Sequence, residues 1–192
     1  MVMKRLFALM ALVVMVSLPS QAQRLIPHQK GLELFGGVPI VQGEKLFRAE
    51  NYLAGVSLVR YFKTANYAFL TLECEGQTYG YRSFDVPVLD GVLQLGYMHP
   101  VLSDGGKNIF LYLGVAGVGG YEKVNGGKAD LPDGAKLLAR SRWVYGGALH
   151  ASLELFLTDN LLLVMRGQGR MLFGSDLNVF RPNVTIGLRV NL

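Results

Sequence analysis

The last segment of the chain alternates between apolar residues and polar or small ones. The apolar set is Val184, Ile186, Leu188, Val190 and Leu192, and the intervening set is Asn183, Thr185, Gly187, Arg189 and Asn191. A two-residue period places successive side chains on opposite faces of a β-strand. One face would then be wholly apolar. It would pack against a second sheet in a soluble sandwich, or face lipid in a membrane barrel.

Similar stretches of about ten residues recur along the chain between turn signals. Within 161–173, Arg166, Gln168 and Arg170 share one face, and Thr158 to Asn160 predicts a tight turn before it. The stretch 109–121 is apolar and Gly-rich on both faces, so its alternation predicts a strand without orienting it. Eight strands are expected, around residues 31–38, 52–62, 68–77, 93–98, 109–121, 143–157, 161–173 and 183–192.

The connections between these strands alternate in length. Long ones are expected at 39–51, 79–87, 122–141 and 174–179, and shorter ones at 63–66, 100–108 and 158–160. Long outward loops, short periplasmic turns and an even number of strands are typical of outer-membrane barrels. We therefore predict an all-β fold, an eight-stranded antiparallel up-and-down outer-membrane β-barrel with short periplasmic turns and longer extracellular loops.

Composition agrees with a membrane barrel and excludes a helical membrane bundle. Mean hydropathy is +0.29 and 51% of the residues are apolar, yet no uncharged apolar run after residue 22 reaches the ~18 residues that a spanning helix needs. The hydrophobic residues are spread among 24 glycines and many polar positions. A closed sheet is the remaining way to satisfy every backbone polar group in lipid.

The N-terminus has the pattern of an export signal. Lys4 and Arg5 precede the unbroken apolar run 6–16, and Ser20 to Ala22 follows Pro19. The alternative, a membrane anchor, would need a longer apolar run to cross the bilayer. We expect a cleaved signal peptide at 1–22 and a barrel domain at 23–192, located in the outer membrane and surrounded by its lipid.

Aromatic residues gather near the ends of the expected strands. Girdles at the two membrane interfaces would place them so, although strands are enriched in aromatics in any case. The set is Tyr52, Tyr61, Phe62, Tyr67, Tyr79, Tyr81, Phe84, Tyr97, Tyr121, Trp143, Tyr145, Phe156 and Phe173.

Charged residues of both signs fall on the face opposite the apolar one. The lumen of an eight-stranded barrel is just wide enough for side chains to fill, and an unpaired charge there would cost several kcal/mol. A paired, structural charge network is therefore expected, and an open ion or substrate path is the less favoured alternative. Its members are Glu33, Glu73, Glu75, Glu154, Arg166, Arg170 and Arg189.

One constellation carries the residue types of acyl-transfer chemistry. His150, Ser152 and Glu154 share a face at two-residue spacing, and the His-x-Ser pair resembles that of outer-membrane lipid A deacylases. In that family the set faces the lipid. Here the alternation places all three in the lumen, so the main interpretation is a lumen network and the alternative is an esterase.

Other chemistry is not indicated. Cys74 is the only cysteine, which excludes an internal disulfide and a thiolate metal cluster, and no phosphate-binding, dinucleotide-binding or zinc motif is present. We expect no enzyme activity, no cofactor and no small-molecule substrate. The net charge of +5 includes Lys4 and Arg5 of the signal segment, and the balance that remains does not predict nucleic-acid binding.

The longest connection, starting near Gly119, exceeds what joining two strands requires. It is either a contact surface outside the cell or a tolerated insertion. The candidate contact residues are Tyr121, Glu122, Asn125, Leu131, Pro132 and Asp133.

Four stretches together resemble the TraO family encoded by conjugative transposons. They are 31–37, 119–125, the Leu-Pro-Asp-Gly-Ala run at 131–135, and 143–147. The resemblance covers nearly the whole chain, signal included. It implies an outer-membrane component of a conjugative DNA-transfer apparatus, a non-catalytic envelope protein whose partners are other transfer (Tra) proteins, and it transfers no catalytic residue. The alternative function is a general small barrel of the adhesion or surface-protection type.

Overall fold

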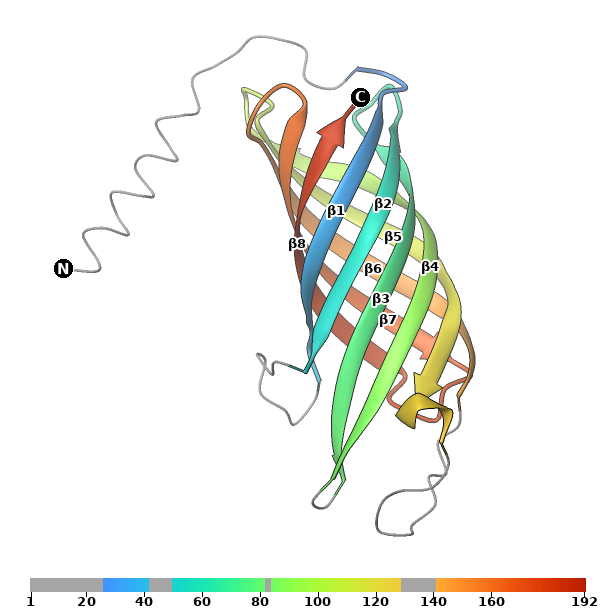
Figure 1. Cartoon of the computed structure of the whole chain (residues 1–192). Coiled ribbons are helices and arrows are strands. Elements are labelled where there is room, and N and C mark those ends of the chain that lie inside the picture. The colour runs from blue at the N-terminus through green and yellow to red at the C-terminus, as the bar shows by residue number, and fades with distance from the viewer. Residues whose placement is uncertain (1–25, 42–49, 82–83, 129–140) are drawn as a thin grey trace, which may run out of the picture.

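A computed structural model describes residues 26–41, 50–81, 84–128 and 141–192 of the chain. These residues form one closed antiparallel sheet in which each strand pairs with the next and the last pairs with the first (Figure 1). The predicted barrel and the number of its strands are confirmed, although the strand expected at 93–98 extends over 84–103. The strands are β1 (Lys30–Pro39), β2 (Tyr52–Tyr61), β3 (Tyr67–Tyr81), β4 (Phe84–Ser103), β5 (Ile109–Val124), β6 (Arg142–Phe156), β7 (Leu161–Phe173) and β8 (Phe180–Asn191).

Pairing of β1 with β8 closes the barrel. The register runs from Gly31 opposite Asn191 to Pro39 opposite Asn183, and the amide of Leu192 donates to the carbonyl of Lys30 at 2.8 Å. Closure leaves no free sheet edge along the wall, which is the condition for a sheet to stand in hydrocarbon. The soluble-sandwich alternative is therefore wrong.

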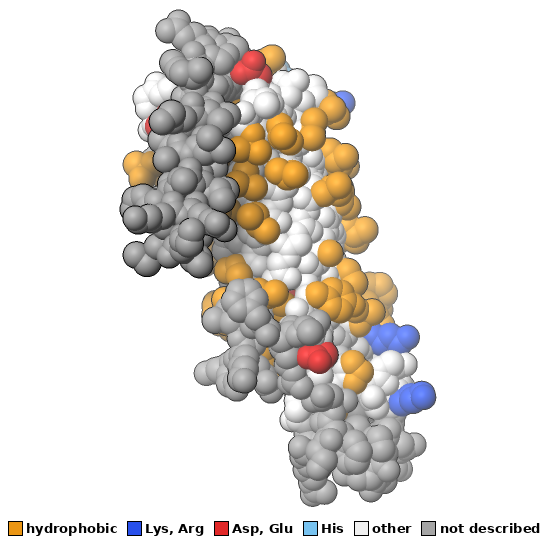
Figure 2. All heavy atoms as spheres, turned by 60° about the vertical axis from the view of Figure 1, so that its left-hand side comes forward, with side chains coloured by type: hydrophobic (Ala, Val, Ile, Leu, Met, Phe, Trp, Pro, Cys, Tyr) orange, Lys and Arg blue, Asp and Glu red, His pale blue; other side chains and the backbone are white. Residues whose placement is uncertain are grey.

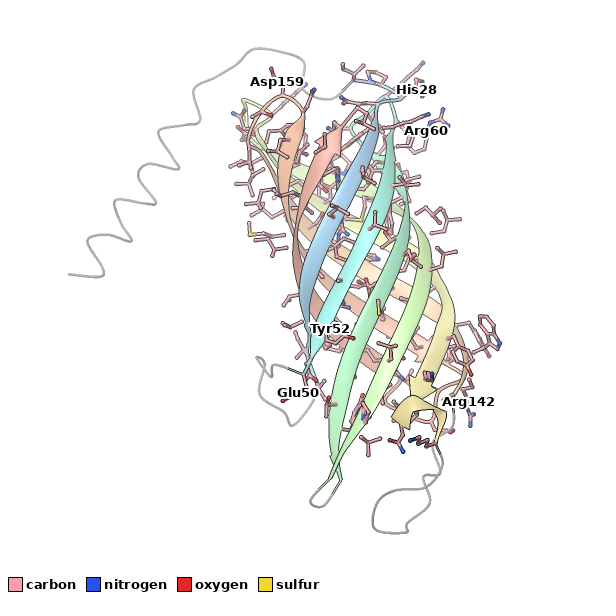
Figure 3. The ribbon with its side chains drawn as sticks, in the orientation of Figure 1. His28, Glu50, Tyr52, Arg60, Arg142 and Asp159 are labelled. Atoms are coloured by element: carbon pink, nitrogen blue, oxygen red, sulfur yellow. The ribbon has the colours of Figure 1, made fainter. Side chains whose placement is uncertain are left out.

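The outer wall is apolar along the middle of the barrel, and every strand contributes to it. Exposed examples, one from each strand in order, are Leu34, Leu58, Leu72, Leu95, Val115, Leu149, Met165 and Ile186. Figure 2 shows hydrophobic side chains over the wall and charged ones toward its ends. The polar residues His28, Arg60 and Asp159 lie at one end in Figure 3, and Glu50 and Arg142 lie at the other.

The two ends of the barrel differ in their connections. The turns 62–66, 104–108 and 157–160 lie at the end that holds the C-terminus (Figure 1). We call this the turn end. The opposite end, the loop end, carries the connections from β1 to β2, β3 to β4, β5 to β6 and β7 to β8. The expected signal segment 1–22 lies outside the described residues.

The expected long loop at 79–87 is wrong. β3 continues to Tyr81 and β4 begins at Phe84, with Thr78 opposite Pro87. The expected connection includes Pro87, but the structure places Pro87 in β4, where β5 pairs with β4 only as far as Val88. Pro87 therefore has no β5 partner to which a backbone amide would have to donate. Strands accept proline at such unpaired edges.

The faces of the β5 strand, which the sequence left unassigned, are set by its neighbours. Phe110, Tyr112, Val118 and Val124 are buried in the lumen, whereas Val115 is exposed on the outer wall.

The aromatic prediction holds in part. Tyr52, Tyr97, Tyr121, Trp143 and Phe173 are exposed on the outer wall, as a girdle requires. The assignment of Tyr61, Tyr67 and Phe156 to a girdle is wrong. These three belong to one buried cluster with Met98 and Phe110. They face inward because the two-residue alternation of their strands turns these positions toward the lumen.

The turn from β4 to β5 is held by the carboxylate of Asp104. It accepts backbone hydrogen bonds from Asn108 at 2.6 Å, Ile109 at 2.7 Å and Gly106 at 3.2 Å. Its slight burial acts to raise the pKa of Asp104, but the bonds from Ile109, Asn108 and Gly106 outweigh this and hold the pKa below the usual value for aspartate. This turn is a local anchor for the register of two strands.

We predict that Asp104→Ala lowers the free energy of unfolding by about 1 kcal/mol at neutral pH, as expected for a lost hydrogen-bonded turn. Because the folded pKa lies below the unfolded one, this contribution is complete above the unfolded pKa and is lost as the pH falls through the folded value. Urea unfolding in phospholipid vesicles, from neutral to strongly acidic pH, measures the difference between the parent and the variant.

Asp104→Asn is the matched control, since its amide oxygen still accepts hydrogen bonds but does not titrate. Its advantage over Asp104→Ala should stay constant with pH. A parent-to-alanine difference that does not shrink in acid contradicts the role assigned to the carboxylate.

Candidate functional site in the barrel lumen and at the loop end

The polar cluster nearest the turn end surrounds Arg189 of β8. Its guanidinium is fully buried and donates to Glu33 at 2.7 Å and to Glu154 at 2.7 Å. It also donates to the hydroxyls of Tyr61 at 2.6 Å and Tyr67 at 3.0 Å. One cation from the last strand thus joins side chains of β1, β2, β3 and β6 across the lumen.

Three further contacts belong to this cluster. Arg166 pairs with Glu33 at 2.9 Å, and the hydroxyl of Tyr67 donates to Glu154 at 2.5 Å. The Arg189 guanidinium also lies 4.6 Å from the centre of the Tyr67 ring. Only arginine offers both a planar donor fork and a face that stacks on an aromatic ring.

A second polar cluster lies around Arg170, nearer the loop end. Arg170 pairs with Glu73 at 2.5 Å and with Glu75. Glu73 also accepts from Gln94 at 3.3 Å, and Gln168 donates to Gln94 at 3.0 Å. The structure thus places all seven charged residues of the expected lumen network inside the barrel and brings each into an ion pair.

A third polar cluster, around Arg181 of β8, was missed by the sequence analysis. Arg181 pairs with Asp90 at 2.7 Å and Glu122 at 2.6 Å, and it donates to the hydroxyl of Ser175 at 2.7 Å. The two-residue alternation could have revealed it, because Arg181 lies on the same face of the strand as Asn183 and Arg189.

Apolar layers separate and cap these clusters. The aromatic cluster of Tyr61, Tyr67 and Phe156 fills the turn end. Val92, Val144 and Leu172 lie in a middle layer, and a third layer at the loop end consists of Val86, Val88 and Val124 packed with Tyr79 and Leu177. The lumen is therefore filled by side chains, as the width of an eight-stranded barrel predicts. This geometry opposes the alternative of an open path.

The His150, Ser152 and Glu154 set does not form a catalytic arrangement. All three are buried in the lumen. The Ser152 hydroxyl points to Glu154 at 3.4 Å, and neither ring nitrogen of His150 has a hydrogen-bond partner among the described residues. His150 instead packs edge-on against Phe69, with ring centres 5.2 Å apart. Among the described residues the imidazole therefore does not hydrogen-bond to the serine, and the serine itself is buried.

The proposed contact residues fall into three groups. Tyr121 and Glu122 lie in β5 and not in a loop, because β5 continues to Val124. Tyr121 faces outward on the wall, and Glu122 is fully buried beside Arg181. Asn125 begins a short 3-10 turn at the loop end, and Leu131, Pro132 and Asp133 lie outside the described residues.

Metal and disulfide chemistry find no support in the described part of the chain. No group of three or more metal-binding side chains is present there. Cys74 is a free, exposed thiol on β3.

We predict that Arg189→Met lowers the free energy of unfolding by about 3–5 kcal/mol, because Glu33 and Glu154 lose their shared cation inside the lumen. Adding Glu154→Gln should recover part of this loss, since Glu33 still has Arg166. Arg142→Met is the matched control. Its partner Asp176 is 2.6 Å away in a half-exposed pair, so the loss should stay below about 1 kcal/mol. Equal losses in Arg189→Met and Arg142→Met, measured by urea unfolding in vesicles, would count against the network.

We also predict that Ser152→Ala leaves ester hydrolysis by the purified protein, and the acylation of lipid A in cells, unchanged. Chromogenic ester assays and mass spectrometry of extracted lipid A measure these. Hydrolysis by the parent that disappears in Ser152→Ala would establish the esterase instead.

Comparisons with known proteins agree with this fold. No helix among the described residues is long and apolar enough to span a membrane. The Ail attachment invasion locus protein of Yersinia pestis superposes with a TM-score of 0.57 at 9% identity, covering 87% of this chain and 100% of that one. Neisserial surface protein A gives 0.52 at 14% identity, covering 85% and 97%. OprG of Pseudomonas aeruginosa, an outer-membrane protein, gives 0.50 at 14% identity, covering 88% and 98%.

These likenesses establish the fold alone, that of small outer-membrane β-barrels. The search of curated proteins gives no match. The family model described as conjugative transposon protein TraO matches residues 26–192, which is the whole barrel. The chain therefore belongs to the TraO family of conjugative transposon proteins.

Proposed function

We propose that this protein is a non-catalytic outer-membrane component of a conjugative DNA-transfer apparatus, exported by a cleaved signal at residues 1–22. Family membership supports the role in conjugation, and the barrel fold supports the location. The three short turns and both ends of the barrel domain would lie in the periplasm, and the loop end would face outward.

The observation that carries a binding role is the filled lumen. Paired charges and apolar layers occupy the interior from the turn end to the loop end. DNA or protein passing through this lumen would have to break several buried ion pairs. The protein therefore acts through its outer surface and its loops, as a docking point for other transfer proteins.

The connection between β5 and β6 is the first candidate for that docking. It begins at the turn of Asn125 to Gly127, in which Gly126 and Gly127 are exposed. Leu131 and Pro132 offer apolar contact, and Asp133 offers charge. Tyr121 and Glu122 are no longer part of the proposed surface, because one belongs to the wall and the other is buried.

We predict that deleting the gene lowers the conjugation frequency by about tenfold or more, and that the plasmid-borne parent restores it. Replacing Leu131, Pro132 and Asp133 together with Gly-Ser-Gly should reproduce the defect while the protein stays in the membrane fraction and keeps heat-modifiable migration on a gel. The matched control replaces residues 157–159 at the turn end with the same sequence.

Transfer that is unchanged on deletion would favour the alternative, a general surface barrel of the adhesion or protection type. A deletion defect that the 131–133 variant does not share would place the docking surface elsewhere on the barrel.

A further inference from the structure

A broad groove runs over the outer wall of the barrel near the loop end. It has a volume of about 1070 Å³ and crosses β4, β5 and β6. Its floor is bare backbone at Gly91, Gly117 and Gly119, and Leu93 and Leu95 form one side. The groove lies in the apolar wall, away from the lumen clusters.

The barrel's own packing does not require these three glycines. A Cβ added at Gly91, Gly117 or Gly119 would meet no atom within 4 Å, and none of the three has a positive φ. Glycine in a strand weakens it relative to residues with side chains. The hollow is therefore not demanded by contacts within the chain, and its shape fits an occupant outside the barrel.

The side of the groove nearest the loop end is aromatic. Tyr121 and Trp143 pack edge-on with ring centres 5.4 Å apart, and Tyr145 and Phe173 lie 6.3 Å apart. Trp143 is 75% exposed. Trp and Tyr lie where hydrocarbon meets headgroups, so the groove starts at headgroup level and extends into the hydrocarbon.

A cation stands just beyond this aromatic side. Lys123 follows Tyr121 by two residues on the same outward face of β5 and is exposed. Its Cε lies 3.9 Å from a Cβ placed on Gly127, so the side chain extends toward the loops. It forms no ion pair with a described residue, whereas the neighbouring Arg142 is held by Asp176. Lysine binds phosphate as a point charge.

We propose that this groove binds a lipid with an anionic phosphate headgroup from the outer leaflet. Its acyl chain lies on the glycine floor between the leucines and the aromatic rings, and its phosphate lies at Lys123. An unbranched chain can lie flat on bare backbone, and the cation matches the headgroup charge. The inference rests on the loop-outward orientation of the proposed function and not on any role in conjugation.

Native mass spectrometry of the protein in detergent micelles, titrated with lipid A, tests this inference. The parent should bind one lipid A more tightly than a phosphatidylcholine of similar chain length. Gly119→Leu fills the groove and should weaken lipid A binding by about tenfold. Lys123→Gln removes the charge without altering the groove and should weaken binding by about threefold.

Two matched controls should leave binding within about twofold of the parent, which corresponds to a change of about 0.4 kcal/mol in the free energy of binding. Gly167→Leu makes the same change at an outward glycine of β7 that is equally open, and Lys63→Gln removes an exposed lysine at the turn end. Parent-like binding by both Gly119→Leu and Lys123→Gln overturns the inference, as does equal binding of phosphatidylcholine.

A change from monomer to dimer in the parent that Gly119→Leu abolishes, without any effect on lipid A, would also overturn the inference and assign the groove to a second copy. Because binding is measured on the isolated protein, its outcome is separate from that of the mating assay.

Discussion

The requirement that every backbone amide and carbonyl be paired inside the sheet determines the rest of this structure. Hydrocarbon offers no hydrogen-bond partner, so the wall must close. The register between β1 and β8 achieves this with strands from opposite ends of the domain. Once the wall is closed, each strand can present an apolar face outward and a mixed face inward, and the two-residue alternation of the sequence follows from that demand.

Closure with eight strands leaves a narrow interior, and the narrowness governs which side chains can stand in it. Among the described residues, Arg166 has one carboxylate partner in the lumen, and Arg170, Arg181 and Arg189 have two each. Removing charges from water is costly unless the geometry of the pair is good. The planar fork of arginine lets one side chain connect several strands, so the polar interior also joins opposite parts of the wall.

The sequence predicted the architecture well where the interior is polar. Arg166, Gln168 and Arg170 assigned the faces of β7 without ambiguity. It could not orient β5, because the inward Ala116 and Val118 do not differ in polarity from the outward Val115. Charged residues of the lumen could be predicted only in those segments that the alternation identified as strands.

Errors in the site came from misplaced strand ends. Asp90 and Glu122 were missed as lumen residues because Pro87 and the Gly119–Gly120 pair suggested loops nearby, whereas β4 and β5 continue past them. Tyr61 and Tyr67 were assigned by residue type, although Tyr61 shares the parity of the polar Ser57 on β2. Pairing across strands decides where β4 and β5 end, whereas the alternation within β2 is enough to turn Tyr61 inward.

The unequal lengths of neighbouring strands have a mechanical consequence. β2 pairs with β3 only as far as Gly76, and β5 pairs with β4 only as far as Val88, so the ends of β3 and β4 near the loop end form a two-stranded arm below the other strands in Figure 1. From Gly76 to Tyr81 this arm extends by about 16 Å along the strand. β4 then continues to Ser103 at the opposite end, with a β-bulge between Pro100 and Leu102. If a bound partner pulled on the arm, the backbone of β4 would therefore carry the force from the loop end to the turn end of the barrel.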